Sequence, residues 1–166
     1  MFRASLFLLL LLTPLSLLAQ TQIDAGVALG RQPYENDLDN PRYLPSVDLL
    51  VRRNAFGGHV AVEYTDLQDI GAMVALHLDA IYRHDGNQVF FLAGAGPTVI
   101  NTGSAANTGS NDVTWNAEIE AGHAWRRAEV FLRVRQYDHS HELFRSAPAS
   151  PSGPAIYVGA RFALRR

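Results

Sequence analysis

Apolar and polar residues alternate most clearly between residues 113 and 135. A period of two indicates β-strands, because successive side chains of a strand point to opposite sides. We expect two strands here, joined at residues 125–128, with Phe131 as an exception that falls on the polar face. Their apolar positions are Val113, Trp115, Ala117, Ile119, Ala121, Ala128, Val130, Leu132 and Val134.

The other face of the same two strands carries Glu118, Glu120, Arg133 and Arg135. One face therefore suits lipid, while the other holds acids beside guanidinium groups. This distribution is typical of a membrane β-barrel, which is apolar outside and polar inside. The inverse interpretation is a soluble barrel with an apolar core, which would have to place these charges in water.

Eight segments have strand-like patterns, and no helical period of useful length follows Ala19. Short connections at residues 54–58, 84–87 and 126–127 alternate with polar ones at 32–43, 68–71, 101–112 and 140–153. Three of the second set are long enough to predict exposed loops, as outer-membrane barrels have at one end. We place the strands at Gln22–Arg31, Leu44–Arg53, His59–Leu67, Ala72–Arg83, Gln88–Ile100, Val113–Arg126, Ala128–His139 and Pro154–Leu164.

Two details of this pattern are not explained by simple alternation. The strand at 88–100 does not alternate cleanly, so its orientation is left open. His123 falls on the apolar face, which is reasonable only near the edge of a membrane. Trp115 and Trp125 lie on that face ten positions apart, which is about 25 Å along the barrel axis for a strand tilted by roughly 40°. We therefore expect the two indoles to mark the two edges of the apolar band.

An eight-stranded barrel is just wide enough for side chains to fill it. Charges buried there must be paired, because an isolated buried ion costs several kcal/mol. We therefore predict an internal network of salt bridges and not a pore, with His59 and His77 as members and not as metal ligands. The charged residues of the network are Asp48, Arg52, Glu63, Asp79, Arg83, Glu118, Glu120, Arg133, Arg135 and Arg161.

Residues 1–19 have the features of a secretory signal peptide: Arg3, then an apolar run, then a small residue at Ala19. Thr13 and Pro14 interrupt the run, which argues against a retained membrane helix. Residues 20–166 then form one barrel domain. The absence of cysteine excludes disulfides, thiolate metal sites and a cysteine lipid anchor. A net charge of −2 offers no basic surplus for nucleic acid.

The mature chain resembles the small eight-stranded outer-membrane proteins of the OmpA/OmpX-like barrel type. Its C-terminal segment looks like the terminal-strand signal that the barrel-assembly machinery reads, although Arg165 and Arg166 extend beyond it. The resemblance implies a Gram-negative outer membrane, with the lipid bilayer and lipopolysaccharide as surroundings. The residues that carry the signal are Tyr157, Gly159, Phe162 and Leu164.

A cluster of reactive side chains lies at the loop end of the seventh predicted strand. His139, Ser140 and His141 are similar to the His-x-Ser-Asn motif of outer-membrane lipid A deacylases, but Ser140 directly follows His139. No Asp or Glu follows Glu142, so the later carboxylate of those enzymes has no counterpart. Adjacent strand residues also point opposite ways, so His139 is poorly placed to activate Ser140. We interpret the cluster as a polar loop base that binds no metal.

These observations predict a non-enzymatic integral outer-membrane protein that serves envelope structure, adhesion or ligand contact. No cofactor, metal or nucleic acid is expected. Two alternatives stay open: a lipid acyl hydrolase that uses His139 or His141 with Ser140, and a soluble exported barrel that binds a small apolar ligand.

Overall fold

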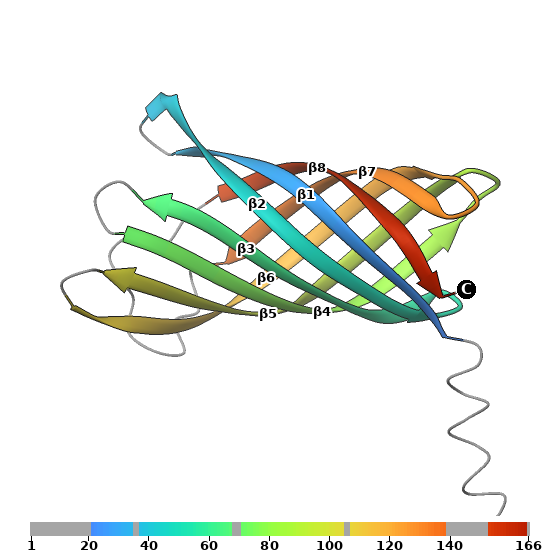
Figure 1. Cartoon of the computed structure of the whole chain (residues 1–166), viewed down its shortest axis with the longest axis horizontal. Helices are drawn as coiled ribbons and strands as arrows, with labels where there is room; N and C mark the ends of the chain where they lie inside the picture. Colours follow the sequence, from blue (N-terminus) through green and yellow to red (C-terminus); the bar gives the residue numbers. More distant parts are fainter. Residues whose placement is uncertain (1–20, 35–36, 68–70, 105–106, 139–152, 166) are drawn as a thin grey trace, which may run out of the picture.

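The structure is a computed structural model that describes residues 21–34, 37–67, 71–104, 107–138 and 153–165. Each strand pairs antiparallel with its sequence neighbours, and β1 pairs with β8, so the sheet closes into a barrel (Figure 1). Within these residues, no helix has the length and apolar character to cross a membrane. The strands are β1 (Gln22–Tyr34), β2 (Asp37–Arg53), β3 (Phe56–Leu67), β4 (Gly71–Asp85), β5 (Val89–Ser104), β6 (Asn107–Ala124), β7 (Ala128–Asp138) and β8 (Gly153–Arg165).

The prediction of an eight-stranded antiparallel barrel is confirmed, but two of the predicted loops are wrong. Residues 32–43 and 101–112 mostly continue the β1–β2 and β5–β6 ladders, with register shifts near their tips. Polar side chains hid these extensions, because ladder hydrogen bonds are made by the backbone and need no apolar face. Most of the third predicted loop, 140–153, lies outside the described residues.

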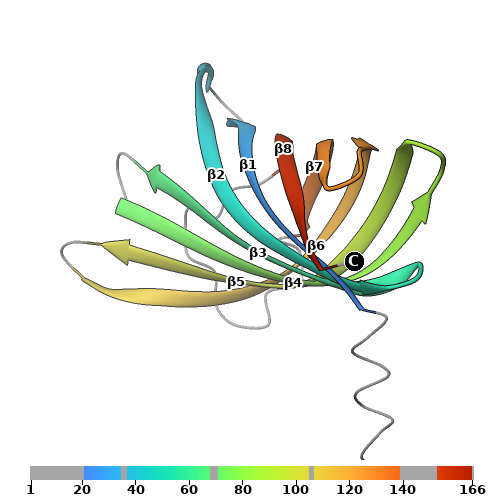
Figure 2. The ribbon, with the colours of Figure 1, turned by 45° about the vertical axis from the view of Figure 1, so that its right-hand side comes forward.

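Three short connections lie at the end of the barrel where β8 ends, and Figure 2 shows this end from a second side. They are residues 54–55, 86–88 and 125–127. Asn54 has a positive φ of 54°, a conformation that asparagine adopts more readily than most residues. Residues 56–58 belong to β3 and not to the predicted connection.

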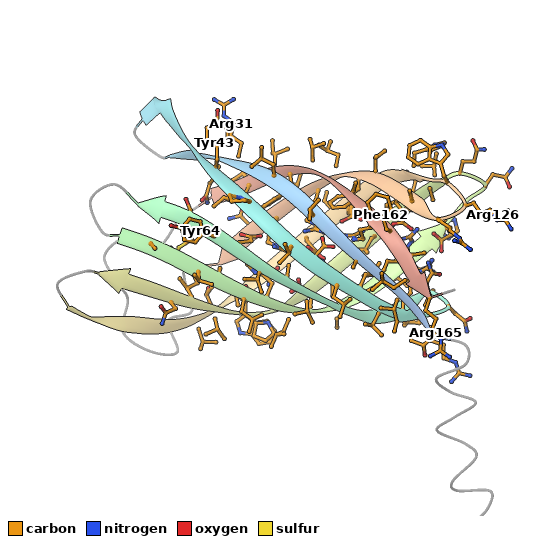
Figure 3. All side chains as sticks on the ribbon, in the orientation of Figure 1. Arg31, Tyr43, Tyr64, Arg126, Phe162 and Arg165 are labelled. Atoms are coloured by element: carbon orange, nitrogen blue, oxygen red, sulfur yellow. The ribbon has the colours of Figure 1, made fainter. Side chains whose placement is uncertain are left out.

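Side chains alternate between the outside and the inside of the barrel, as Figure 3 shows. Val27, Leu132 and Val158 are more than half exposed on the outside. Strand β5, whose orientation the sequence left open, turns Phe90 inward and Phe91 outward. The interior is therefore partly apolar.

Two interior aromatics are packed against glycines of neighbouring strands. Phe131, the exception in the sequence pattern, is buried opposite Gly159, and Tyr157 is buried opposite Gly30. A Cβ atom on either glycine would come within 3 Å of the facing ring. The missing side chains therefore make room for rings that could not otherwise fit. Elsewhere in the interior, Leu50, Ile81 and Leu92 form a buried apolar cluster.

Candidate functional site

The buried charges of the barrel interior form the candidate site. They lie inside because each occupies an inward position of a strand with a period of two. All ten residues named below are at most 6% exposed. We call them the central cluster: Asp48, His59, Glu63, His77, Asp79, Glu118, Glu120, Arg133, Arg135 and Arg161.

Arg161 and Arg133 share the same two carboxylates. Arg161 binds Glu120 through both terminal nitrogens, one at 2.6 Å, and its Nε lies 3.1 Å from Asp48 Oδ1. Arg133 donates from Nε to Glu120 at 3.0 Å and from Nη2 to Asp48 at 2.6 Å. The Arg161 guanidinium also lies over the Phe131 ring, 4.2 Å from its centroid. The four charged groups therefore form a closed ring of ion pairs.

Arg135 organises a second group of charges in the central cluster. It binds Glu63 through Nη1, and its Nη2 donates to Glu118 Oε2 at 2.6 Å. The Tyr157 hydroxyl donates to the other oxygen of Glu63 at 3.0 Å. Glu63 is thus held from two strands, β7 and β8, although it lies on β3.

The two buried histidines have different surroundings. His59 Nδ1 lies 2.7 Å from Glu118 Oε1 and 3.7 Å from Asp79 Oδ2. His77 Nδ1 lies 2.8 Å from the Thr98 hydroxyl. His59, Asp79 and Glu118 bring three potential metal-ligand atoms within 4.8 Å of one another.

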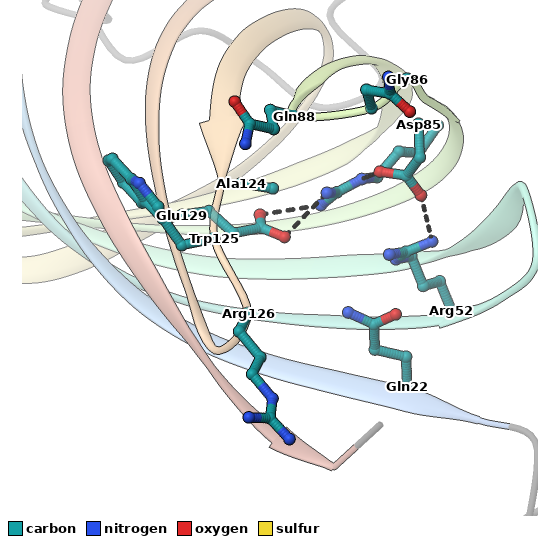
Figure 4. A pocket seen from close by; sticks show the side chains of 11 residues that line it. Gln22, Arg52, Asp85, Gly86, Gln88, Ala124, Trp125, Arg126 and Glu129 are labelled. Atoms are coloured by element: carbon teal, nitrogen blue, oxygen red, sulfur yellow. Dashed lines mark hydrogen bonds and ion pairs between the residues drawn. The ribbon is translucent and has the colours of Figure 1, made fainter.

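A chain of ion pairs crosses the barrel at the end with the short turns (Figure 4). Arg52 lies 2.8 Å from Asp85, and Asp85 in turn binds Arg83 Nε at 2.7 Å. Arg83 makes two hydrogen bonds of 2.8 Å to Glu129. These residues line an open pocket of about 460 Å³. Arg52 and Arg83, which the sequence assigned to the internal network, therefore lie in the mouth of the barrel.

Two interior residues, Glu129 and Asn116, lie on the polar face of the predicted strands but were not assigned to the internal network. Glu129 shares its face with Arg133 and Arg135, so its inward position was visible, but its partner Arg83 lies on β4 and only barrel closure brings them together. Asn116 follows the same parity as Glu118 and donates to Asp79 Oδ1 at 2.8 Å. An amide carries no charge, so the sequence pattern provided no reason to include Asn116 in a network of salt bridges.

The predicted interface aromatics are on the outside. Trp115 is 49% exposed and Trp125 is 52% exposed. His123, which contradicted the apolar face, packs edge-on against Trp125 with ring centroids 4.6 Å apart. His123 lies near the end of β6, beside the 125–127 turn.

The four residues of the terminal-strand signal are divided between the two faces of β8. Tyr157 is buried inside, and Gly159 faces the Phe131 ring. Phe162 and Leu164 are exposed on the outside. The possible catalytic cluster, His139, Ser140 and His141, lies outside the described residues.

Comparisons with known proteins identify similar structures. Neither a protein-family model nor a curated protein sequence matches the chain. The N-terminal β-barrel domain of OprF from Pseudomonas aeruginosa matches with a TM-score of 0.59 and 13% identity, covering 87% of this chain and 98% of that one. Neisserial surface protein A matches with a TM-score of 0.57 and 13% identity, over 86% and 96% of the two chains. The chain therefore shares the fold of these eight-stranded outer-membrane barrels.

Proposed function

We propose that the chain is a non-enzymatic integral protein of the outer membrane, with a sealed, ion-paired interior. The observation that carries this proposal is the placement of the charges: the central cluster is buried inside, while the outer wall is apolar. A soluble barrel that binds an apolar ligand would need the opposite arrangement.

The outer wall supports contact with hydrocarbon. Large apolar side chains on several strands are roughly 40–70% exposed, which is far more contiguous apolar surface than a soluble monomer tolerates. Lipid removes that surface from water. Examples are Val27, Leu29, Val47, Val74, Phe91, Ile119, Leu132, Ile156, Val158 and Phe162.

The closed ladder meets the second requirement of a membrane segment. Backbone groups in hydrocarbon must be satisfied within the protein, and a barrel achieves this because it has no open edge. Pairing of β1 with β8 over residues 23–31 completes the circle. The fold and the outer wall together therefore suit a bilayer.

The end opposite the short turns is the surface that we assign to external contacts. There β1–β2 and β5–β6 extend as hairpins beyond the predicted strand ends (Figure 1). In the orientation typical of outer-membrane barrels, the short turns face the periplasm and the longer ends face outward. Envelope architecture, adhesion and ligand contact, with lipopolysaccharide as a neighbour, are roles for this outer end. The outward Phe162 and Leu164 would be read by the assembly machinery.

Fractionation of Gram-negative cells that express the chain tests this proposal. We expect the protein in the outer-membrane fraction, resistant to a high-salt wash and released by detergent. Recovery in the soluble periplasmic fraction, or release by salt alone, would contradict it. A Ser140→Ala variant, assayed for released acyl chains, addresses the catalytic alternative, and we expect no release from either form.

A further inference from the structure

We propose that His59, Asp79 and Glu118 form a binding site for a divalent transition-metal ion of the zinc class inside the barrel. The three side chains come from β3, β4 and β6, and all are buried. This proposal departs from the sequence-based expectation that His59 is not a metal ligand. Nothing in the membrane role requires such a site, so the two proposals stand or fall separately.

The first support is a buried carboxylate oxygen without a hydrogen-bond partner. Asp79 Oδ2 accepts no hydrogen bond, although its side chain is fully buried. It faces His59 Nδ1 at 3.7 Å, and the nearest guanidinium nitrogen, from Arg135, lies 3.6 Å away. A buried unsatisfied oxygen is costly, and a cation beside it removes that cost.

The second support is the way each carboxylate is held. Asp79 Oδ1 accepts from Asn116 at 2.8 Å, and Glu118 Oε2 accepts from Arg135 at 2.6 Å. The remaining oxygen of each carboxylate is turned towards His59 Nδ1. Hydrogen-bonded outer partners that fix one oxygen of each carboxylate are characteristic of metal sites. Of the two remaining oxygens, Asp79 Oδ2 has no hydrogen-bond partner and Glu118 Oε1 bonds only the proposed ligand His59.

The orientation of the His59 ring also fits that of a metal ligand. Its Nδ1 faces the two available oxygens, while its Nε2 lies 3.4 Å from Asp48 Oδ2. A metal-binding histidine usually donates its second ring N–H to a carboxylate, which fixes the tautomer and the ring plane. Asp48 Oδ2 and Arg133 Nη2 both lie 3.4 Å from His59 Nε2, so an Nε2–H in the metal-bound form would be directed at Asp48. In this structure His59 Nδ1 is hydrogen-bonded to Glu118 Oε1 at 2.7 Å, and a metal ion would take the place of the proton between them.

The distances fit a small ion. Zinc bonds of about 2.0–2.2 Å in tetrahedral geometry place neighbouring ligand atoms about 3.4 Å apart. The two separations from His59 Nδ1, 2.7 Å to Glu118 and 3.7 Å to Asp79, lie on either side of that value. All three ligand atoms lie within 4.8 Å of one another, so rotations of the two carboxylates are what a zinc ion would require to bond all three. One nitrogen and two oxygens suit zinc better than calcium, which takes six to eight oxygens.

Charge balance gives a third, independent support. The central cluster holds five carboxylates and three guanidinium groups, leaving two negative charges when both histidines are neutral. Excess charge of one sign is costly in a low-dielectric interior. A proton on His59 would neutralise one of these charges, whereas a divalent ion at His59 Nδ1 neutralises both.

The site is enclosed, so the ion has to enter while the barrel closes. We therefore test it by refolding the full chain in detergent with zinc, followed by desalting into a chelator. The wild-type chain should retain about one zinc ion, and X-ray absorption should show one imidazole nitrogen at about 2.0–2.1 Å with oxygens as the other ligands. Two or more imidazoles per zinc would place the ion elsewhere and overturn the proposal.

Variants supply the matched comparison. His59→Gln and Asp79→Asn should lose the retained zinc, whereas His77→Gln should keep it, because His77 is equally buried but outside the trio. Folding of each variant is checked by circular dichroism. Zinc retained by folded His59→Gln, or none retained by the wild type, would show that the trio holds only a protonated imidazole. If a variant does not fold, the wild-type stoichiometry and ligand count decide the question.

Discussion

Arg161 and Arg133 each contact both Glu120 and Asp48, so the removal of one guanidinium leaves two carboxylates underneutralised. A buried charge that loses its partner costs far more than the pair itself contributes, because the remaining ion is neither hydrated nor neutralised. At the scale of single residues, the interior is therefore sensitive to the loss of one member.

We expect Arg161→Met to lower the free energy of unfolding by about 3–5 kcal/mol, because Glu120 and Asp48 stay buried. Arg165→Met is the matched control on the same strand. Arg165 is exposed, and its loss should change stability by no more than about 0.5 kcal/mol. Equilibrium unfolding in urea, with the barrel in lipid vesicles, measures both. Equal stability of the two variants would mean that Arg161 is not buried among acids.

Packing in the interior makes a second residue-scale prediction. Gly159→Ala should destabilise the barrel by about 1–3 kcal/mol, because the new methyl group meets the Phe131 ring. Combining it with Phe131→Leu should recover part of that loss, since the two sites are in contact. Unfolding of the two single variants and the double variant completes a thermodynamic cycle. Strict additivity would show that the ring does not occupy the space above Gly159.

At the scale of elements, each strand separates an apolar outer row from an inner row of mixed character. In β7, Leu132 is 52% exposed, while its neighbours Phe131 and Arg133 are 3% and 0% exposed. The closed ladder fixes this separation, because a one-residue slip would exchange the two faces.

We expect Leu132→Arg to cost about 2–4 kcal/mol in lipid, because the guanidinium would lie near the middle of the membrane. Tyr43→Arg is the control, since Tyr43 points outward near the far end of β2 (Figure 3). Near an interface the cost should fall to about 0–1 kcal/mol. Unfolding in vesicles compares the two, and an unchanged stability of Leu132→Arg would reverse the assigned faces.

The elements also show how far sequence reasoning extends. Alternation located most of the eight strands, because burial on one face leaves a period of two, while β5 was placed without a clean alternation. It failed at the hairpin extensions near 32–43 and 101–112, where backbone pairing continues without an apolar row. It also failed for partners such as Arg83 and Glu129, because pairing across the barrel depends on closure. Phe90 remained unassigned because an inward aromatic beside an outward one erases the alternation.

At the scale of the whole molecule, the barrel is a filled cylinder. The central cluster occupies the interior, and the ion-pair chain from Arg52 to Glu129 crosses one mouth. In the central cluster and in this mouth, the charged groups are bound to each other. Water or ions would have to break these ion pairs to pass through the barrel. Large apolar side chains remain exposed on the outside of the described strands.

We expect the protein in planar lipid bilayers to show no large, steady single-channel current, because side chains fill an eight-stranded barrel. Addition of protein-free detergent gives the baseline. A reproducible open level well above that baseline would mean that the ion pairs do not close the interior.

The most direct test of the inside–outside arrangement uses two adjacent residues of β7. In a background with Trp115→Phe and Trp125→Phe, a single tryptophan is placed either by Leu132→Trp or by Phe131→Trp, and brominated lipids act as quenchers. We expect strong quenching for the outward position and little for the inward one. Stronger quenching at residue 131, or none at either position, would contradict a barrel with charges inside and hydrocarbon outside.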